Sequence, residues 1–170
     1  MLDFDTKPPL TTADFLQDCG RLLSENDAAD MRLALSDISR PERVSNRLLK
    51  NWIEFNRRFR NEIAWFRAIG ANKEPAGYTR GDRYVEPFLV DKVIEASRAS
   101  DPLAGEKVID RTRWQKLDEL ALGHYFDLEF LITYGLKLKI LERYEIVNSP
   151  KGQEMLKAYL DLELPEFERV

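Results

Sequence analysis

The sequence is poor in the residues that metal centres, disulfides and many active sites require. It has one cysteine, Cys19, which excludes an intramolecular disulfide and favours a reducing compartment. It has one histidine, His124, so the usual zinc ligand sets and a di-iron bundle with two Glu-x-x-His pairs cannot form. Walker A, G-x-G-x-x-G and G-x-S-x-G motifs are absent as well. We therefore expect neither a metal nor a cofactor.

Long apolar runs and an excess of positive charge are also missing. The net charge is −4 with both signs mixed along the chain, which argues against a general nucleic-acid-binding protein. The most apolar stretch runs from His124 to Ile146, but its longest charge-free run, Phe130 to Leu136, is far shorter than the roughly 20 residues of a membrane span. The N-terminus shows no signal-peptide pattern. These features predict a cytoplasmic protein that does not insert into a membrane.

What the sequence contains is a series of helix signals separated by proline and glycine. Thr11 or Thr12, Ser24 and Asp101 are suited to cap helices, and Pro41, Pro87 and Pro102 are suited to first turns. Only "RYVEPFLV" approaches strand-like alternation. We therefore predict an all-α fold. Its expected helices run from 12 to about 23, 24 to 38, 42 to 69, 87 to 97, 102 to 122, 127 to 148 and 149 to 160.

The expected helix over 127–148 is apolar on nearly all sides. Its polar stripe is narrow and contains Lys139 and Arg143. A helix of this kind is usually covered by its neighbours, so the pattern predicts a helical bundle with a long central buried helix, in a single domain. The helix expected over 42–69 carries one apolar stripe, made of Leu48, Trp52, Phe55, Phe59, Ile63 and Phe66. The glycine-rich segment from Gly70 to Gly81 predicts a loop between an N-terminal and a C-terminal helical part.

Two carboxylates lie where a helical wheel predicts burial. Glu62 borders the aromatic stripe of the helix over 42–69, and Asp110 falls among apolar residues of the helix over 102–122. A buried carboxylate needs a cationic partner, and Arg113 is among the nearby arginines. We interpret both acids as structural and paired, with catalysis as the alternative, and we interpret His124 as a hydrogen-bonded residue between helices.

Trp65 lies on the polar side of its helix, so it either packs under another segment of the chain or marks a contact surface. Arg57, Arg58 and Arg60 of the same helix could contact phosphate, although Glu54 and Glu62 flank them and favour a solvated face of ion pairs. The candidate interface residues are Trp65, Arg58, Arg80 and Arg83.

The segment from "ASDPLAGEKVIDRTRW" through "LGHYFDLEFLITYGLKLKILERYE" to "SPKGQEML" resembles a bacterial helical family of unknown function that accompanies V/A-type rotary ATPases. "NWIEFNRRFRNEIAWFRA" is similar to the preceding long helix of that family. "LDFDTKPPLTTADFL" is similar to its start, without the aromatic residues expected just before it, so we expect the chain to begin at an internal or reassigned methionine.

That family is in turn distantly similar to the C subunit of A/V-type ATPases, called d in eukaryotes, which joins the central stalk to the membrane rotor ring. The resemblance implies a non-catalytic adaptor, peripheral to the inner membrane, whose partners are stalk or ring subunits. The chain has about half the length of a three-lobed C subunit. A helical adaptor for an unrelated partner and an enzyme that uses Asp110 or Glu62 are the alternatives.

Overall fold

The computed structural model describes residues 2–36, 44–149, 152, 154, 155 and 158, and over these residues the fold is all-α without strands. This confirms the predicted fold class. The elements are α1 (Thr12–Leu22), α2 (Glu25–Leu35), α3 (Arg47–Gly70), the short 3-10 helix η2 (Pro75–Tyr78), α4 (Pro87–Ser97), α5 (Pro102–Leu120) and α6 (Leu128–Asn148). The helix expected over 149–160 lies mostly outside the described residues. The Gly152 N–H donates to Ser149 Oγ at 3.0 Å, as a helix cap would require.

Side-chain caps begin the helices as the sequence predicts. Thr11 accepts from the N–H of Asp14, Ser24 from that of Asp27, and Asp101 from that of Ala104. The predicted start of the long helix at Glu42 is wrong. Residues 44–46 are not helical, and α3 begins at Arg47 because the side chain of Asn46 accepts from the N–H of Leu49.

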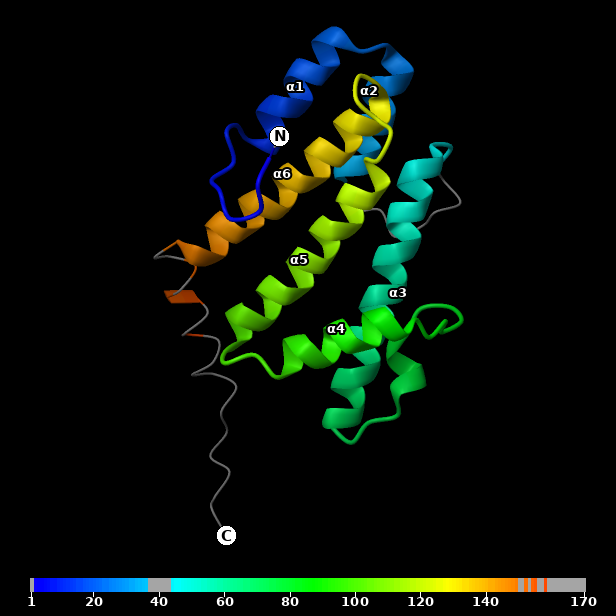
Figure 1. Ribbon diagram of the computed structural model, residues 1–170, viewed down its shortest axis with the longest axis vertical. Helices are drawn as coiled ribbons and strands as arrows, with labels where there is room; N and C mark the ends of the chain where they lie inside the picture. Colours follow the sequence, from blue (N-terminus) through cyan, green and yellow to red (C-terminus); the bar gives the residue numbers. More distant parts are fainter. Residues whose placement is uncertain (1, 37–43, 150–151, 153, 156–157, 159–170) are drawn as a thin grey trace.

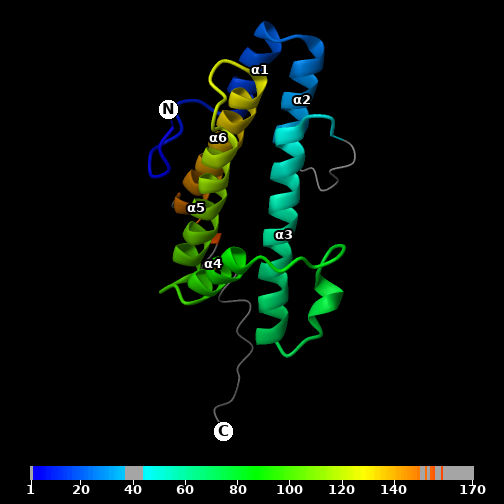
Figure 2. The same cartoon turned by 45° about the vertical axis from the view of Figure 1, so that its right-hand side comes forward.

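The helices form two hairpins and a long helix beside them. α5 and α6 run antiparallel, and the hairpin of α1 and α2 packs against α6 (Figure 1). α3 stands on the other side of α5, and α4 packs against both α3 and α5 near one end of the molecule (Figure 2). The segment 70–81 is a predicted loop, but it contains η2, which folds back onto α3.

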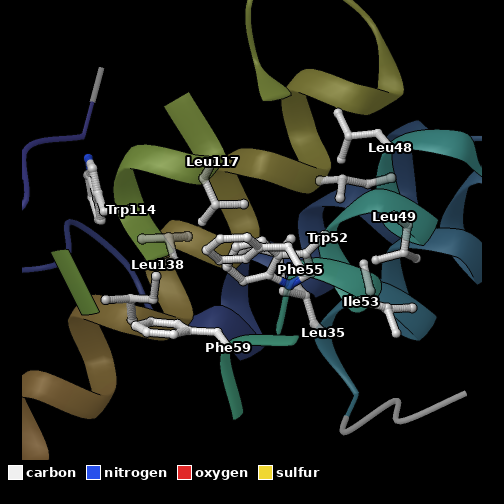
Figure 3. Close-up of a cluster of buried hydrophobic side chains, with 14 of the residues drawn as sticks. Leu35, Leu48, Leu49, Trp52, Ile53, Phe55, Phe59, Trp114, Leu117 and Leu138 are labelled. Carbon is white, nitrogen blue, oxygen red and sulfur yellow. The ribbon is translucent and has the colours of Figure 1, made fainter. Parts of the chain in front are cut away.

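Large side chains from α3, α5 and α6 meet in one core (Figure 3). Most of the predicted apolar stripe of α3 is buried there: Leu48, Trp52, Phe55 and Phe59. Phe66 breaks the pattern, because 40% of it is exposed. The second half of α3 is covered on a different side, where η2 and the residues after it bury Asn61 and Glu62.

α6 is the interior helix that its sequence predicts, up to Leu141. Its buried side chains are Ile132, Thr133, Leu136, Lys137, Leu138, Ile140 and Leu141, with α1 and α2 on one side and α5 on the other. Beyond Leu141 the side chains of Arg143, Glu145 and Ile146 are exposed. No helix among the described residues is long and apolar enough to cross a membrane.

The buried cation of α6 is Lys137, outside the polar stripe that the sequence indicated. Its Nζ donates to a carboxylate oxygen of Asp118, and it lies 5.0 Å from the ring centroid of Trp114. A lysine can be buried at this position because its charge has both a carboxylate partner and an aromatic face.

The contact between α4 and α5 depends on a glycine. A Cβ on Gly105 would lie 2.7 Å from the backbone oxygen of Ala96, which cannot move without shifting α4. We expect Gly105→Ala to lower the free energy of unfolding by about 1–3 kcal/mol. Gly20→Ala is the matched control, since a Cβ there meets nothing within 4 Å, and it should raise stability by about 0.5–1 kcal/mol. Urea denaturation of the two variants measures both effects, and equal shifts would contradict the close contact.

The N-terminal cap of α5 should make the stability of the protein depend on pH. The N–H of Ala104 lowers the pKa of Asp101 below its ordinary value, helped by Ser100. A carboxyl whose pKa is lower in the folded state stabilises the protein above its unfolded pKa, near pH 4, and this stabilisation is lost as the pH falls through the folded pKa. We expect the Asp101→Asn variant to keep the cap, so that its Tm falls less than that of the wild type between pH 6 and pH 3. A loss equal to that of the wild type would show that Asp101 does not contribute.

Candidate functional site

Glu62 lies on α3 and is 3% exposed, where the sequence placed it near the core. Arg83 holds it through two hydrogen bonds, from Nε to Oε1 at 3.0 Å and from Nη2 to Oε2 at 2.7 Å. The same guanidinium lies 4.2 Å from the ring centroid of Trp65. Trp65 therefore packs under a later segment of its own chain, the first of the two alternatives. Arg83, a candidate interface residue, is engaged with both side chains.

The segment before Arg83 is fixed to α3 by a buried amide. Asn61 Nδ2 donates to the carbonyl of Arg80 and Asn61 Oδ1 accepts from the N–H of Arg80, both at 3.0 Å. Gly81 follows with a φ of +66°, a conformation that favours glycine. The backbone of Arg80 is thus held rigidly, while its side chain is exposed.

Arg58 forms a network at the surface of α3. Its Nε donates to Glu54, which also accepts from Arg57, and its guanidinium lies 4.8 Å from the ring centroid of Tyr84. Hydrogen bonds from Arg57 and Arg58 lower the pKa of Glu54, whereas its partial burial acts in the opposite direction. This part of α3 is a face of ion pairs, which is how the sequence pattern was interpreted.

Asp110 is 1% exposed and connects two helices of the core. It accepts from Arg113 at 3.0 Å within α5, and from Arg143 of α6. Burial lowers the pKa of Arg113, and the nearby charges of Arg143 and Arg60 add to this while Asp110 opposes it. The sequence offered Arg113 as one of several candidate partners for the buried acids, whereas the second partner of Asp110, Arg143, was assigned to the polar stripe of its helix.

His124 lies in the turn between α5 and α6. Its Nδ1 is 2.6 Å from Asp127, whose other carboxylate oxygen accepts from the N–H of Phe130 and caps α6. Hydrogen bonding by His124 lowers the pKa of Asp127, despite some desolvation. Glu129 lies close enough to His124 and Asp127 for the three to hold a cation, but it accepts from Asn46. These contacts fix the turn and begin α6, which agrees with the structural interpretation of His124.

The same turn exposes an apolar tip, which we define as Leu122, Tyr125 and Phe126. Phe126 is fully exposed, Leu122 is 77% exposed and Tyr125 is 69% exposed. The turn lies at the same end of the molecule as the turn between α1 and α2 (Figures 1 and 2). Helical periodicity could not reveal this tip because its residues lie outside the helices. The only sequence signal was the pair of aromatic residues Tyr125 and Phe126, which begins two positions after Gly123.

The described residues thus define an all-α protein in which the buried acids Glu62 and Asp110 are paired with arginines. Several of its most exposed apolar side chains lie in the turn between the core helices α5 and α6. Residues 88–163 match the family described as "Protein of unknown function (DUF2764)". The matched region contains nearly all of α4 and the whole α5–α6 hairpin with its tip. Comparisons with curated proteins and with solved structures gave no match.

Proposed function

We propose that the protein is a non-catalytic subunit or accessory protein of a V/A-type rotary ATPase, which docks to the central stalk or the rotor ring in the manner of a C/d-type adaptor. The sequence resemblance supplies the identity of the complex. The structural observation that carries the docking role is the apolar tip. In this proposal the protein is cytoplasmic and reaches the inner membrane only through the complex.

The tip has the properties of a docking anchor. Aromatic side chains contribute strongly to interfaces because they bury a large area and lose little conformational entropy. Phe126 and Tyr125 offer such an area, and the hydrogen bond between His124 and Asp127 fixes the turn that presents them. A rigid tip on a hairpin of core helices can transmit a contact to the rest of the body.

The positions of the two candidate catalytic acids favour a structural role. Glu62 and Asp110 are buried, and each accepts hydrogen bonds from arginine, so neither is poised to exchange a proton with a bound substrate. Both acids instead connect segments that are distant in the sequence. This supports the adaptor over the enzyme alternative.

Affinity purification from gently solubilised cells tests the proposal. The tagged protein should recover stalk or ring subunits of the rotary ATPase, and Phe126→Ala should reduce this recovery severalfold. Ile69→Ala is the matched control, because Ile69 is also exposed but lies at the far end of α3, and it should recover the complex like the wild type. Recovery of a different partner that also depends on Phe126 would identify the unrelated-adaptor alternative. Repeated absence of rotary ATPase subunits would refute the proposed complex.

A further inference from the structure

A groove is lined by residues of α3 and of the α5–α6 hairpin. It contains a cavity of about 740 Å³ and a second of about 540 Å³. Arg60, Ala64, Tyr78, Arg113 and Arg143 line both cavities, which makes them parts of one groove. The larger cavity alone has the size of a small-molecule site.

The groove is strongly basic in an acidic protein. The larger cavity is lined by one carboxylate, Asp110, and by six basic side chains: Arg57, Arg60, Arg80, Arg113, Lys139 and Arg143. The smaller cavity adds Arg67 and Lys73 against Glu106. Because the whole chain has a net charge of −4, this concentration of positive charge is local to the groove. Such a groove attracts and holds anions.

The acids near the groove are already engaged. Asp110 binds Arg113 and Arg143, Glu106 lies 3.5 Å from Arg67, and Glu54 binds Arg57. Within the described ranges, no carboxylate forms an ion pair with Arg60 or Arg80, and both side chains are exposed. Burial is the main cause of the lowered pKa of Arg113, and the like charges of Arg143 and Arg60 lower it further. A bound anion would offset these like charges.

Apart from Ser36, Asn56 and Asn61, the rest of the lining of the larger cavity is apolar and aromatic. Trp52 and Tyr78 border the larger cavity, together with aliphatic side chains of α3 and α6. A ligand that fits therefore combines several negative charges with a planar or apolar part. Guanidinium groups bind phosphate particularly well, because their planar fork matches its oxygens. A flat membrane surface cannot enter a groove between helices.

We propose that the groove between α3 and the α5–α6 hairpin binds a phosphate-bearing small molecule of nucleotide size. Arg60 and Arg80 supply the unpaired positive charges for the phosphates, with Arg113 and Arg143 behind them. Trp52 and Tyr78 border the space for the remainder of the ligand. This site is independent of the tip and of any docking to a rotary ATPase.

Isothermal titration of the full chain with ATP, inorganic pyrophosphate and adenosine tests the site. We expect ATP to bind and adenosine not to bind. Binding of pyrophosphate as tight as that of ATP would place the recognition in the phosphates alone, whereas weaker binding would show that the aromatic part of the groove contributes. Absence of binding by both phosphate compounds at millimolar concentration would overturn the proposal, as would adenosine binding as tightly as ATP.

Charge-reversal variants locate the binding. Arg60→Glu and Arg80→Glu should each weaken ATP binding at least about tenfold, since each reverses a charge beside the phosphates. Arg32→Glu and Arg98→Glu are matched controls, because these arginines are exposed outside the groove, and they should change binding by less than about twofold. Circular dichroism checks that all four variants remain folded. Equal weakening by groove and control variants would mean that only net charge attracts the anion, and would refute the site.

Discussion

Replacement of Asp110 with alanine should lower the free energy of unfolding by about 3–5 kcal/mol. The carboxylate is almost wholly buried and accepts from Arg113 and Arg143, and only 16% of the Arg113 side chain is exposed. Without Asp110, the charge of Arg113 would stay buried and unpaired beside that of Arg143. Urea denaturation followed by circular dichroism gives the change.

The matched control for this prediction is Asp5→Ala. Asp5 also pairs with two cations, Lys107 and Arg111, but its side chain is 53% exposed. Exposed ion pairs contribute little, so this variant should lose less than about 1 kcal/mol. If Asp110→Ala were no more destabilising than Asp5→Ala, the Asp110 pair could not be a buried link between α5 and α6.

Phe59→Ala should cost about 3–5 kcal/mol of stability. Phe59 has no exposed surface, and its ring packs against that of Phe55, which also lies on α3 (Figure 3). The guanidinium of Arg113 lies 5.9 Å from the ring centroid of Phe59. Truncation would leave a cavity where α3 meets the α5–α6 hairpin, and neighbouring side chains are too tightly packed to fill it.

The same substitution at the tip provides the control. Phe126→Ala removes an identical side chain that is fully exposed, so stability should change by less than about 0.5 kcal/mol. A large loss at Phe126 would show that its ring packs within the protein, which would remove the basis for a docking tip. A small loss at Phe59 would contradict the described core.

Local signals in the sequence were sufficient to predict most of the helix starts and the interior position of α6. The caps at Thr11, Ser24 and Asp101 depend only on neighbouring residues. A helix that is apolar on nearly all sides, such as α6, is expected to be buried whichever elements of the fold cover it. The start of α3 was misassigned because Pro41 and Asn46 are both acceptable helix-start residues. Local chemistry does not show which one is used.

Features that depend on distant residues could not be predicted in detail. Glu62 needed a cation, but nothing in the sequence indicated that Arg83, 21 positions away, would supply it rather than an arginine of α3. The basic groove has the same origin, since Arg60 and Arg143 line it from helices far apart in the chain.

The interior position of α6 can be tested by hydrogen exchange. Amides of residues 132–141 should exchange only through global unfolding, with a free energy equal to that from urea denaturation, because α1, α2 and α5 cover them. Amides of 143–148 should exchange more readily. If residues 132–141 exchanged as readily as 143–148, α6 would not be the covered helix on which the fold is built.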